Sequence, residues 1–279
     1  MTDVKRVGFL GFGDIGLPMA RRVIGKGYQM TICGHVRRTP IEEMKSLGAV
    51  EVRTPKEVAE RCEVIITMVL TEAQTREVIA GANGLLQGAA PGTGIVMMST
   101  LSPGFCRQME EEAASKGVIV IDAPVAGGAV GAEAGKLGIS VGGPKEAVER
   151  YRAVLESMGS ILYCGGVGSG EVVKLANNMV AFTNILVAHE AISWGIKNGA
   201  DEDMLVKLMR VGSAGSWMLQ NWEGVRRSWE DANSPAFRIA VKDLSIALRI
   251  GEEVRHSCPF TALACEYWKA GAPRMPEVK

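Results

Sequence analysis

The chain has 279 residues and a formal net charge of zero, because 31 Lys and Arg residues balance 31 Asp and Glu residues. A nucleic-acid-binding protein usually carries a basic surplus, so no nucleic-acid partner is expected. With 47% hydrophobic and 22% charged residues the chain is expected to fold, and its length predicts two domains.

The first half alternates short apolar runs with longer amphipathic ones. The apolar runs predict strands over residues 6–10, 29–33, 64–69, 95–98 and 118–122. Helical patterns such as 17–26 and 105–116 lie between them. Strands that alternate with helices are typical of βαβ units, which build a parallel sheet. Residues 137–141 and 161–163 predict two further short strands.

The second half lacks strand patterns and is predicted to be helical. Residues 164–170 contain four glycines and indicate a hinge or a tight connection. Residues 171–197 form one long helical pattern that is apolar on nearly every side, which predicts a buried helix between two domains. We expect an N-terminal domain over residues 1–164 and an all-helical domain over 165–279.

A GxGxxG motif follows the first predicted strand and opens the first helix. Its residues are Gly11, Phe12, Gly13, Asp14, Ile15 and Gly16. In dinucleotide-binding folds such glycines permit a tight turn, close approach to a pyrophosphate and packing of the helix on the sheet. A simple glycine-rich turn is the alternative, and Asp14 would repel a phosphate unless it faces solvent. The position at the first βα turn favours a dinucleotide site.

The residues after the second strand distinguish the two nicotinamide cofactors. An acidic residue there binds the ribose 2′-hydroxyl of NAD, whereas an arginine accommodates the 2′-phosphate of NADP. This chain has Arg37 and Arg38 and no acid before Glu42. The pattern favours NADP(H) and leaves NAD(H) open, with a solvated basic loop as the alternative interpretation.

Two later segments contain candidate substrate residues. Closely spaced glycines in residues 122–135, at positions 127, 128, 131 and 135, can present backbone N–H groups to a carboxylate, although the spacing alone favours a flexible crossover loop. Lys174 and Asn178 stand four residues apart, so a helix places both on one face. On an apolar helix this pair is costly unless it meets partners or a cleft, and burial lowers the pKa of a lysine toward the range useful for proton transfer. A lysine that reaches toward solvent is the alternative.

Two other polar features have simpler interpretations. Lys242 and Asp243 open another helical stretch and by themselves indicate a solvated helix start. His189 lies on the long apolar helix and is interpreted as a buried core histidine.

Neither a metal site nor a targeting segment is predicted. The six cysteines form no CxxC pair, and the three histidines lie far apart in sequence. The N-terminus lacks the longer apolar region of a signal peptide. No run approaches the ~18 apolar residues of a membrane span. These features predict a soluble, cytoplasmic protein with reduced thiols, no metal and no membrane partner.

In this order, the segments over residues 11–16, 122–128, 168–178 and 242–244 resemble the β-hydroxyacid dehydrogenase family. That family includes 3-hydroxyisobutyrate dehydrogenase, tartronate semialdehyde reductase and succinic semialdehyde reductases, and is related to 6-phosphogluconate dehydrogenase. The resemblance implies a Rossmann-like α/β domain, a long interdomain helix and an all-α domain. It also implies an NAD(P)-dependent oxidoreductase that moves a hydride between the nicotinamide and a small 3-hydroxy acid or semialdehyde.

The resemblance further implies roles for single residues. Lys174 would be the catalytic general acid and base. The substrate would be held by Ala126, Gly127, Gly128 and Asn178. Further cofactor contacts would come from Val69, Leu70, Thr100 and Lys242. Ala126 stands where the family usually has a serine that helps to bind the substrate carboxylate, so one hydrogen bond is missing there.

Three other functions stay open at this point: an imine reductase, an aldehyde reductase and a non-catalytic dinucleotide-binding module. Relatives with imine reductase activity, and those used as interaction domains, usually replace the lysine, so Lys174 counts against both. We also expect a homodimer or homotetramer, because the long apolar helix and the helical domain leave hydrophobic surface for a partner subunit.

Overall fold

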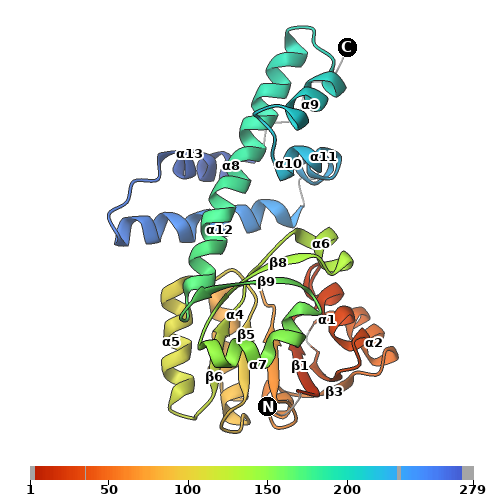
Figure 1. Cartoon of the computed structure of the whole chain (residues 1–279), viewed down its shortest axis with the longest axis vertical. Coiled ribbons are helices and arrows are strands. Elements are labelled where there is room, and N and C mark those ends of the chain that lie inside the picture. The colour runs from red at the N-terminus through yellow and green to blue at the C-terminus, as the bar shows by residue number, and fades with distance from the viewer. Residues whose placement is uncertain (1–3, 35, 231–233, 272–279) are drawn as a thin grey trace. The chain divides into compact units, whose positions relative to one another are not determined.

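The computed structural model describes residues 4–34, 36–230 and 234–271 (Figure 1). The chain divides into two compact units, Met1–Lys174 and Leu175–Lys279. Helix α8 (Ser169–Lys197) begins in the first unit and continues in the second. The domain boundary expected after residue 164 lies near the end of the strand Gly159–Gly165, ten residues before the division after Lys174. This boundary stays a prediction.

The first unit is built around a nine-stranded sheet of order β3-β2-β1-β4-β5-β6-β8-β7, with β9 paired to β8. The strands are β1 (Arg6–Leu10), β2 (Gln29–Cys33), β3 (Val50–Val52), β4 (Val64–Thr67), β5 (Gly94–Met97), β6 (Ile119–Asp122), β7 (Val125–Ala126), β8 (Leu137–Gly142) and β9 (Gly159–Gly165). The first six are parallel, which confirms the expected parallel sheet. Strand β8 runs antiparallel to β6 and β7, a reversal that the sequence pattern did not indicate.

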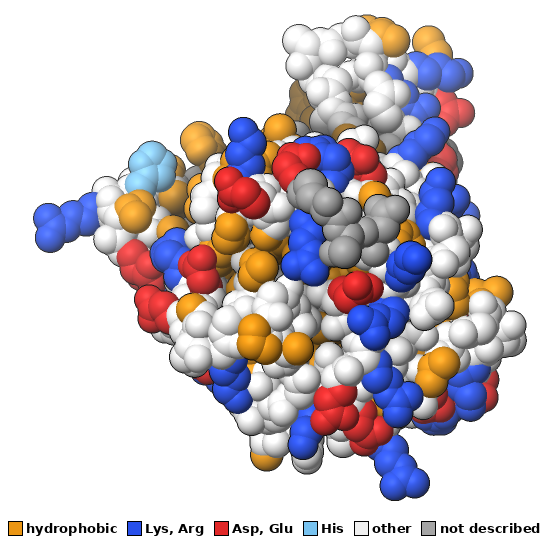
Figure 2. Space-filling model, turned by 60° about the horizontal axis from the view of Figure 1, so that its bottom comes forward, with side chains coloured by type: hydrophobic (Ala, Val, Ile, Leu, Met, Phe, Trp, Pro, Cys, Tyr) orange, Lys and Arg blue, Asp and Glu red, His pale blue; other side chains and the backbone are white. Residues whose placement is uncertain are grey.

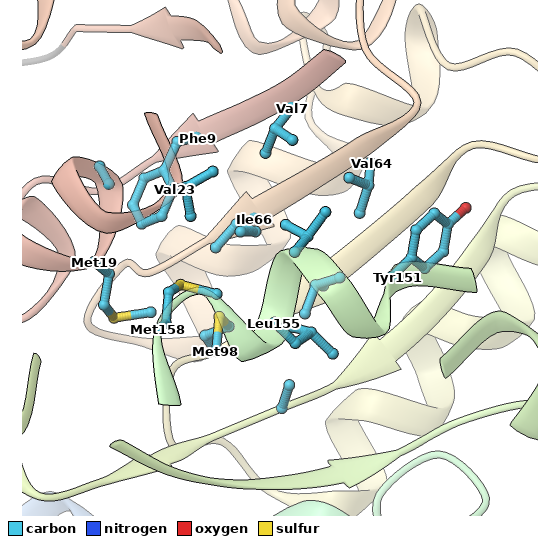
Figure 3. Close-up of a cluster of buried hydrophobic side chains, with 14 of the residues drawn as sticks. Val7, Phe9, Met19, Val23, Val64, Ile66, Met98, Tyr151, Leu155 and Met158 are labelled. Carbon is cyan, nitrogen blue, oxygen red and sulfur yellow. The ribbon is translucent and has the colours of Figure 1, made fainter. Parts of the chain in front are cut away.

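Helices cover both faces of this sheet. They are α1 (Gly16–Gly25), α2 (Thr39–Ser46), α3 (Pro55–Ala59), α4 (Glu72–Ala80), the 3₁₀ turn η1 (Leu85–Gln87), α5 (Pro103–Ala114), α6 (Gly128–Ala134) and α7 (Lys145–Glu156). Alternate strand residues point to opposite faces. Ile66 therefore belongs to a core cluster with residues of α1, α2 and α7, of which Figure 3 labels those from α1 and α7. Ile65 belongs to the cluster with residues of α3, α4 and α5. Two covered faces explain why the strands are continuous apolar runs.

The second unit contains only helices among its described residues, as expected. Besides most of α8 these are α9 (Glu202–Val211), α10 (Trp217–Gln220), α11 (Trp222–Glu230), α12 (Pro235–Glu253) and α13 (Pro259–Ala270). One core cluster joins α8, α12 and α13, where Trp268 meets the ring of Phe182 edge-on with centroids 5.8 Å apart. A second cluster joins α8 to α9, α10 and α11.

The expectation that α8 is buried on all sides is wrong for this chain. Val180, Val187 and Trp194 are each 60% exposed or more. The helix is apolar all round, whereas the elements of the chain cover only part of its circumference. By length and composition alone α8 also qualifies as a membrane span, with a window of mean hydropathy 1.3 of which 28% is buried. This finding corrects the expectation that no apolar run approaches the length of a membrane span. Core helices of soluble proteins meet the same criterion.

The surface has mixed charge. On the face in Figure 2, Lys and Arg side chains are interspersed with Asp and Glu side chains. Ion pairs such as Arg76–Glu112 and Arg152–Glu149 join exposed residues of the first unit.

Candidate active site

The glycine motif lies where the strand order reverses, between β1 and β4. Gly11 has φ +104°, and a Cβ there would lie 2.2 Å from the carbonyl oxygen of Met68. A Cβ on Gly16 would lie 2.0 Å from the carbonyl oxygen of Gly11. Both glycines are therefore required by the protein's own packing. In open α/β sheets, ligands bind beside the carboxyl ends of the strands at such a reversal.

Gly13 differs from the other two motif glycines. A Cβ there would meet only the Arg37 guanidinium, at 4.0 Å. The space in front of this residue is open, which fits the backbone approach that a pyrophosphate needs. Asp14 is exposed, so its carboxylate has access to solvent. Phe12 and Ile15 pack against the core, and Phe12 lies 5.5 Å from the Phe9 ring, so their side chains hold the loop in place.

The ends of β4 and β5 lie beside this loop. The Ser99 hydroxyl donates a hydrogen bond to the carbonyl of Val69. The backbone N–H of Leu70 donates to the side-chain oxygen of Gln74 at 3.0 Å, within a capping box that starts α4. Thr100 follows β5 and is half-buried. The structure thus brings the predicted cofactor positions 69, 70 and 100 to one edge of the sheet, together with the glycine motif.

Arg37 and Arg38 follow β2 and have different partners. Arg38 forms two hydrogen bonds to Glu51, at 2.5 and 2.9 Å, and one to Glu42 at 2.8 Å. The Arg38 guanidinium lowers the pKa of the Glu51 carboxyl below its ordinary value. Arg37 donates to the carbonyl of Phe12 at 3.2 Å, beside the glycine motif. Among the described residues, no carboxylate lies within ion-pair distance of Arg37.

The predicted substrate loop follows β6 and is not a flexible crossover. Ala126 ends the two-residue strand β7, and Gly127, with φ +118°, precedes the short helix α6 that begins at Gly128. Ala126 and Gly127 are half-buried, and Gly128 is exposed. Ala126 pairs with Gly138 of β8. Substrate binding by these three residues stays a prediction.

The start of α8 is attached to the end of β6 through Asp122. This buried carboxylate accepts hydrogen bonds from the backbone N–H of Gly168 at 2.6 Å and of Glu171 at 2.9 Å. Burial raises the pKa of Asp122 to about 6, and these backbone hydrogen bonds oppose that rise. Lys174 lies one turn further along α8 and is 9% exposed. The interpretation of Lys174 as a solvent-reaching lysine is therefore wrong.

In the second unit, Asn178 and Lys242 share a partner. The Asn178 side-chain amide donates to the carboxylate of Asp243 at 2.6 Å, and the Lys242 ammonium lies 2.8 Å from the same carboxylate. Asp243 and Asn178 are buried, and Lys242 is half-buried. Since a carboxylate only accepts hydrogen bonds, Asp243 fixes which end of the Asn178 amide faces it. Lys242 does not open a helix, because it lies within α12.

Three candidate residues do not follow from the sequence patterns: Asp122 and Ser99 in the first unit and Asp243 in the second. Each stands inside or next to a quoted motif, so a signal was present. Their hydrogen bonds to Val69, Gly168 and Asn178 span 30 to 65 residues of the chain, which no local pattern reveals.

In the described part of the chain, no group of three His, Cys, Asp or Glu side chains is arranged to hold a metal ion. All six cysteines are free thiols. His189 is buried on α8, and burial lowers its pKa, as expected of a core histidine.

Comparisons with known proteins agree with this geometry. Residues 6–166 match the family model described as the NAD binding domain of 6-phosphogluconate dehydrogenase. Residues 168–277 match the one described as NAD-binding of NADP-dependent 3-hydroxyisobutyrate dehydrogenase. The 3-hydroxyisobutyrate dehydrogenase of Pseudomonas aeruginosa is 35% identical over 272 residues, which cover 95% of this chain and 90% of that protein.

Two further relatives point the same way. The NAD-dependent L-serine dehydrogenase of Pseudomonas aeruginosa is 31% identical over 279 residues, covering 95% of this chain and 92% of that protein. The solved structure of Mycobacterium tuberculosis 3-hydroxyisobutyrate dehydrogenase with L-serine has a TM-score of 0.82 and 27% identity, covering 96% of this chain and 93% of that one.

The dinucleotide-binding sheet and the helical second unit therefore define an NAD(P)-dependent oxidoreductase. The chain belongs to the β-hydroxyacid dehydrogenase family, as the motifs indicated.

Proposed function

We propose that this protein interconverts a small 3-hydroxy acid and the corresponding semialdehyde, with Lys174 as the group that carries the proton. The observation that supports this most is the placement of Lys174. It is nearly buried on a helix that begins at the carboxyl end of β6, and β1, β4 and β5 end at this same edge of the sheet. A nearly buried lysine near the expected cofactor position is suited to proton transfer.

The residues present fit a nicotinamide dinucleotide, because Gly13 faces open space where a pyrophosphate needs close approach. The motif residues 11–16 would hold the pyrophosphate, and Val69, Leu70 and Thr100 would contact the rest of the cofactor, with Lys242 as a further contact. The bound cofactor supplies or accepts the hydride. In oxidation, the uncharged Lys174 amine takes the hydroxyl proton as the carbon–hydrogen bond breaks. In reduction, the Lys174 ammonium returns a proton to the carbonyl oxygen.

The substrate class is supported by the relatives. 3-Hydroxyisobutyrate and L-serine, which their names and titles give, both carry a hydroxyl on carbon 3 and a carboxylate. We assign the carboxylate to the loop of Ala126, Gly127 and Gly128, and substrate orientation to Asn178. Because Ala126 has no hydroxyl, the backbone of this loop would supply the hydrogen bonds at that position.

For the cofactor we propose a preference for NADP(H) that depends on Arg37. Arg37 lies beside the glycine motif without a described carboxylate partner, so its guanidinium is available to a 2′-phosphate. Arg38, by contrast, is held by Glu51 and Glu42. We therefore assign Arg38 a supporting role.

We also propose a homodimer or homotetramer in the cytoplasm, without nucleic-acid or membrane partners. The exposed apolar residues of α8 support the assembly, because a second copy of the chain would remove them from water. The same burial accounts for the hydropathy of α8 without a membrane.

The test is a substrate panel with purified enzyme. Small 3-hydroxy acids, the matching semialdehydes, simple aldehydes and cyclic imines are each assayed with NAD(H) and NADP(H). We expect the highest kcat/KM for a 3-hydroxy acid and its semialdehyde. A higher kcat/KM for an imine, or for an aldehyde that lacks a carboxylate, would contradict the proposal, and so would cofactor binding without turnover of any compound.

A further inference from the structure

The carboxylate of Asp122 joins the sheet to the helix that carries Lys174. Asp122 is the last residue of β6 and is fully buried. Its two oxygens accept from different donors, Oδ1 from the N–H of Gly168 and Oδ2 from the N–H of Glu171. Both N–H groups are at the helix start, where α8 itself offers them no acceptor. One side chain therefore fixes two backbone N–H groups at the start of the helix, those of Gly168 and Glu171.

The surroundings leave this carboxylate little freedom. A Cβ on Gly142 would lie 2.5 Å from Oδ1, and one on Gly170 would lie 2.8 Å from Oδ2. On the same turn, the Ser140 hydroxyl donates to the carbonyl of Gly170 at 2.9 Å. Strands β6 and β8 thus both hold the start of α8 through polar contacts.

Val167 before the helix and Leu175 after Lys174 are buried in apolar clusters, but the two apolar residues nearest the Asp122 contact within α8 are exposed. Val172 and Val173, the two residues before Lys174, are 54% and 40% exposed. A buried carboxylate is a costly helix cap, and burial raises its pKa to about 6, whereas a serine or threonine would cap the helix at lower cost. The free-energy cost of burying the Asp122 carboxylate is explained if its contacts with Gly168 and Glu171 set the position of the helix start.

We propose that Asp122 is a positioning residue for Lys174: through Gly168 and Glu171 it sets the rotation and depth of the first turns of α8. This inference rests on the proposed role of Lys174. A displacement of about 1 Å in a catalytic group can cost on the order of a hundredfold in rate. Loss of the contact should therefore reduce kcat while cofactor binding is retained.

The test compares Asp122→Asn with Asp201→Asn. Asp201 caps α9 by accepting from the N–H of Met204 at 3.0 Å, and α9 contains no predicted site residue. Asp122→Asn keeps one acceptor but places an N–H₂ group against a backbone donor. We expect about a tenfold to hundredfold loss of kcat, an unchanged dissociation constant for NAD(P)H by fluorescence, and wild-type circular dichroism. Asp201→Asn should retain wild-type kcat.

A second variant covers the case in which Asp122→Asn does not fold. Ser140→Ala removes only the hydroxyl that holds Gly170, and it should lower kcat severalfold without changing NAD(P)H affinity. Wild-type kcat in the folded Asp122→Asn protein, or in Ser140→Ala if only that variant folds, would overturn the inference. A loss of kcat in Asp201→Asn equal to that in Asp122→Asn would also overturn the inference. Full activity of Lys174→Ala would instead refute the proposed function, so the two failures are distinguishable.

Discussion

Arg37 and Arg38 are adjacent, yet their different contacts give them different expected roles. Arg38 is held by two carboxylates, and a 2′-phosphate would have to compete with both. Arg37 contacts only a backbone carbonyl of the glycine motif among the described residues. Cofactor preference should therefore depend on one arginine of the pair.

Arg37→Ala should weaken NADP(H) binding about tenfold to a hundredfold, because a charge-assisted contact to phosphate is worth roughly 1.5–3 kcal/mol. NAD(H) binding should change little. Arg38→Ala is the matched control and should alter the NADP/NAD preference much less. Fluorescence titration of both variants with both cofactors measures this. An equal loss for NADP(H) and NAD(H) in Arg37→Ala would rule out the assignment.

Gly13 and Gly16 provide a second pair of matched variants. Gly16→Ala places a Cβ against the Gly11 carbonyl and should destabilise the fold by about 1–3 kcal/mol. Gly13→Ala enters open space, so its free energy of unfolding should stay near wild type while cofactor affinity falls. Urea unfolding and cofactor titration test both variants. Unchanged cofactor affinity in Gly13→Ala would show that the open space is not the pyrophosphate site.

At the scale of residues, the sequence predicted which segments of the first unit come together at one edge of the sheet, but not the contacts that single residues make. The motif containing Asp122 is visible in the sequence, but its contacts with Gly168 and Glu171 depend on a distant turn. Arg37 and Arg38 look equivalent in sequence. Their difference depends on Glu51, which binds Arg38 and lies on the short strand β3. That strand has too few residues for a clear alternation pattern.

At the scale of elements, the buried cap of α8 makes stability depend on pH. Burial raises the pKa of Asp122 from 3.8 to about 6, so the folded chain binds more protons than the unfolded chain between these values. Stability from this group is therefore fully present below its unfolded pKa and is lost as pH rises through about 6. For His189, whose pKa is lowered by burial, the sign is opposite: its contribution to stability is present above the unfolded pKa and is lost as pH falls through the folded pKa.

The Asp122→Asn variant isolates this contribution, because His189 is present in both proteins and cancels in the difference. Between about pH 7 and about pH 5, the free energy of unfolding of the wild type should rise by about 1 kcal/mol relative to the variant. Urea unfolding of both proteins at the two pH values measures the difference. The same pH dependence in both proteins would mean that Asp122 does not titrate in this range.

Among elements, the long ones were predictable and the short ones were not. The five predicted strands of the first half occur within two residues of their expected ends, because continuous apolar runs mark strands covered on both faces. Helix α6 was missed because Gly and Ala dominate its sequence and its helical conformation depends on packing against α1 and β8. The exposure of α8 was also missed, since hydropathy does not tell which chain covers a helix.

At the scale of the whole molecule, the exposed apolar residues of α8 predict an assembly. Light scattering at micromolar concentration should give a dimer or a tetramer. Val187→Glu should shift the protein toward monomer, because it introduces a charge into the apolar contact. Val50→Glu, on the exposed edge strand β3, is the control and should leave the assembly intact. A monomeric wild type would contradict the prediction.

Single-turnover stopped-flow with Lys174→Ala tests most directly whether Lys174 carries the proton while the first unit binds the cofactor. We expect hydride transfer to slow by about a hundredfold or more, with NAD(P)H affinity near wild type. Lys174→Arg should not restore the rate, because a guanidinium does not deprotonate in a protein. A near-normal rate in Lys174→Ala, or a loss explained entirely by weaker NAD(P)H binding, would contradict the account.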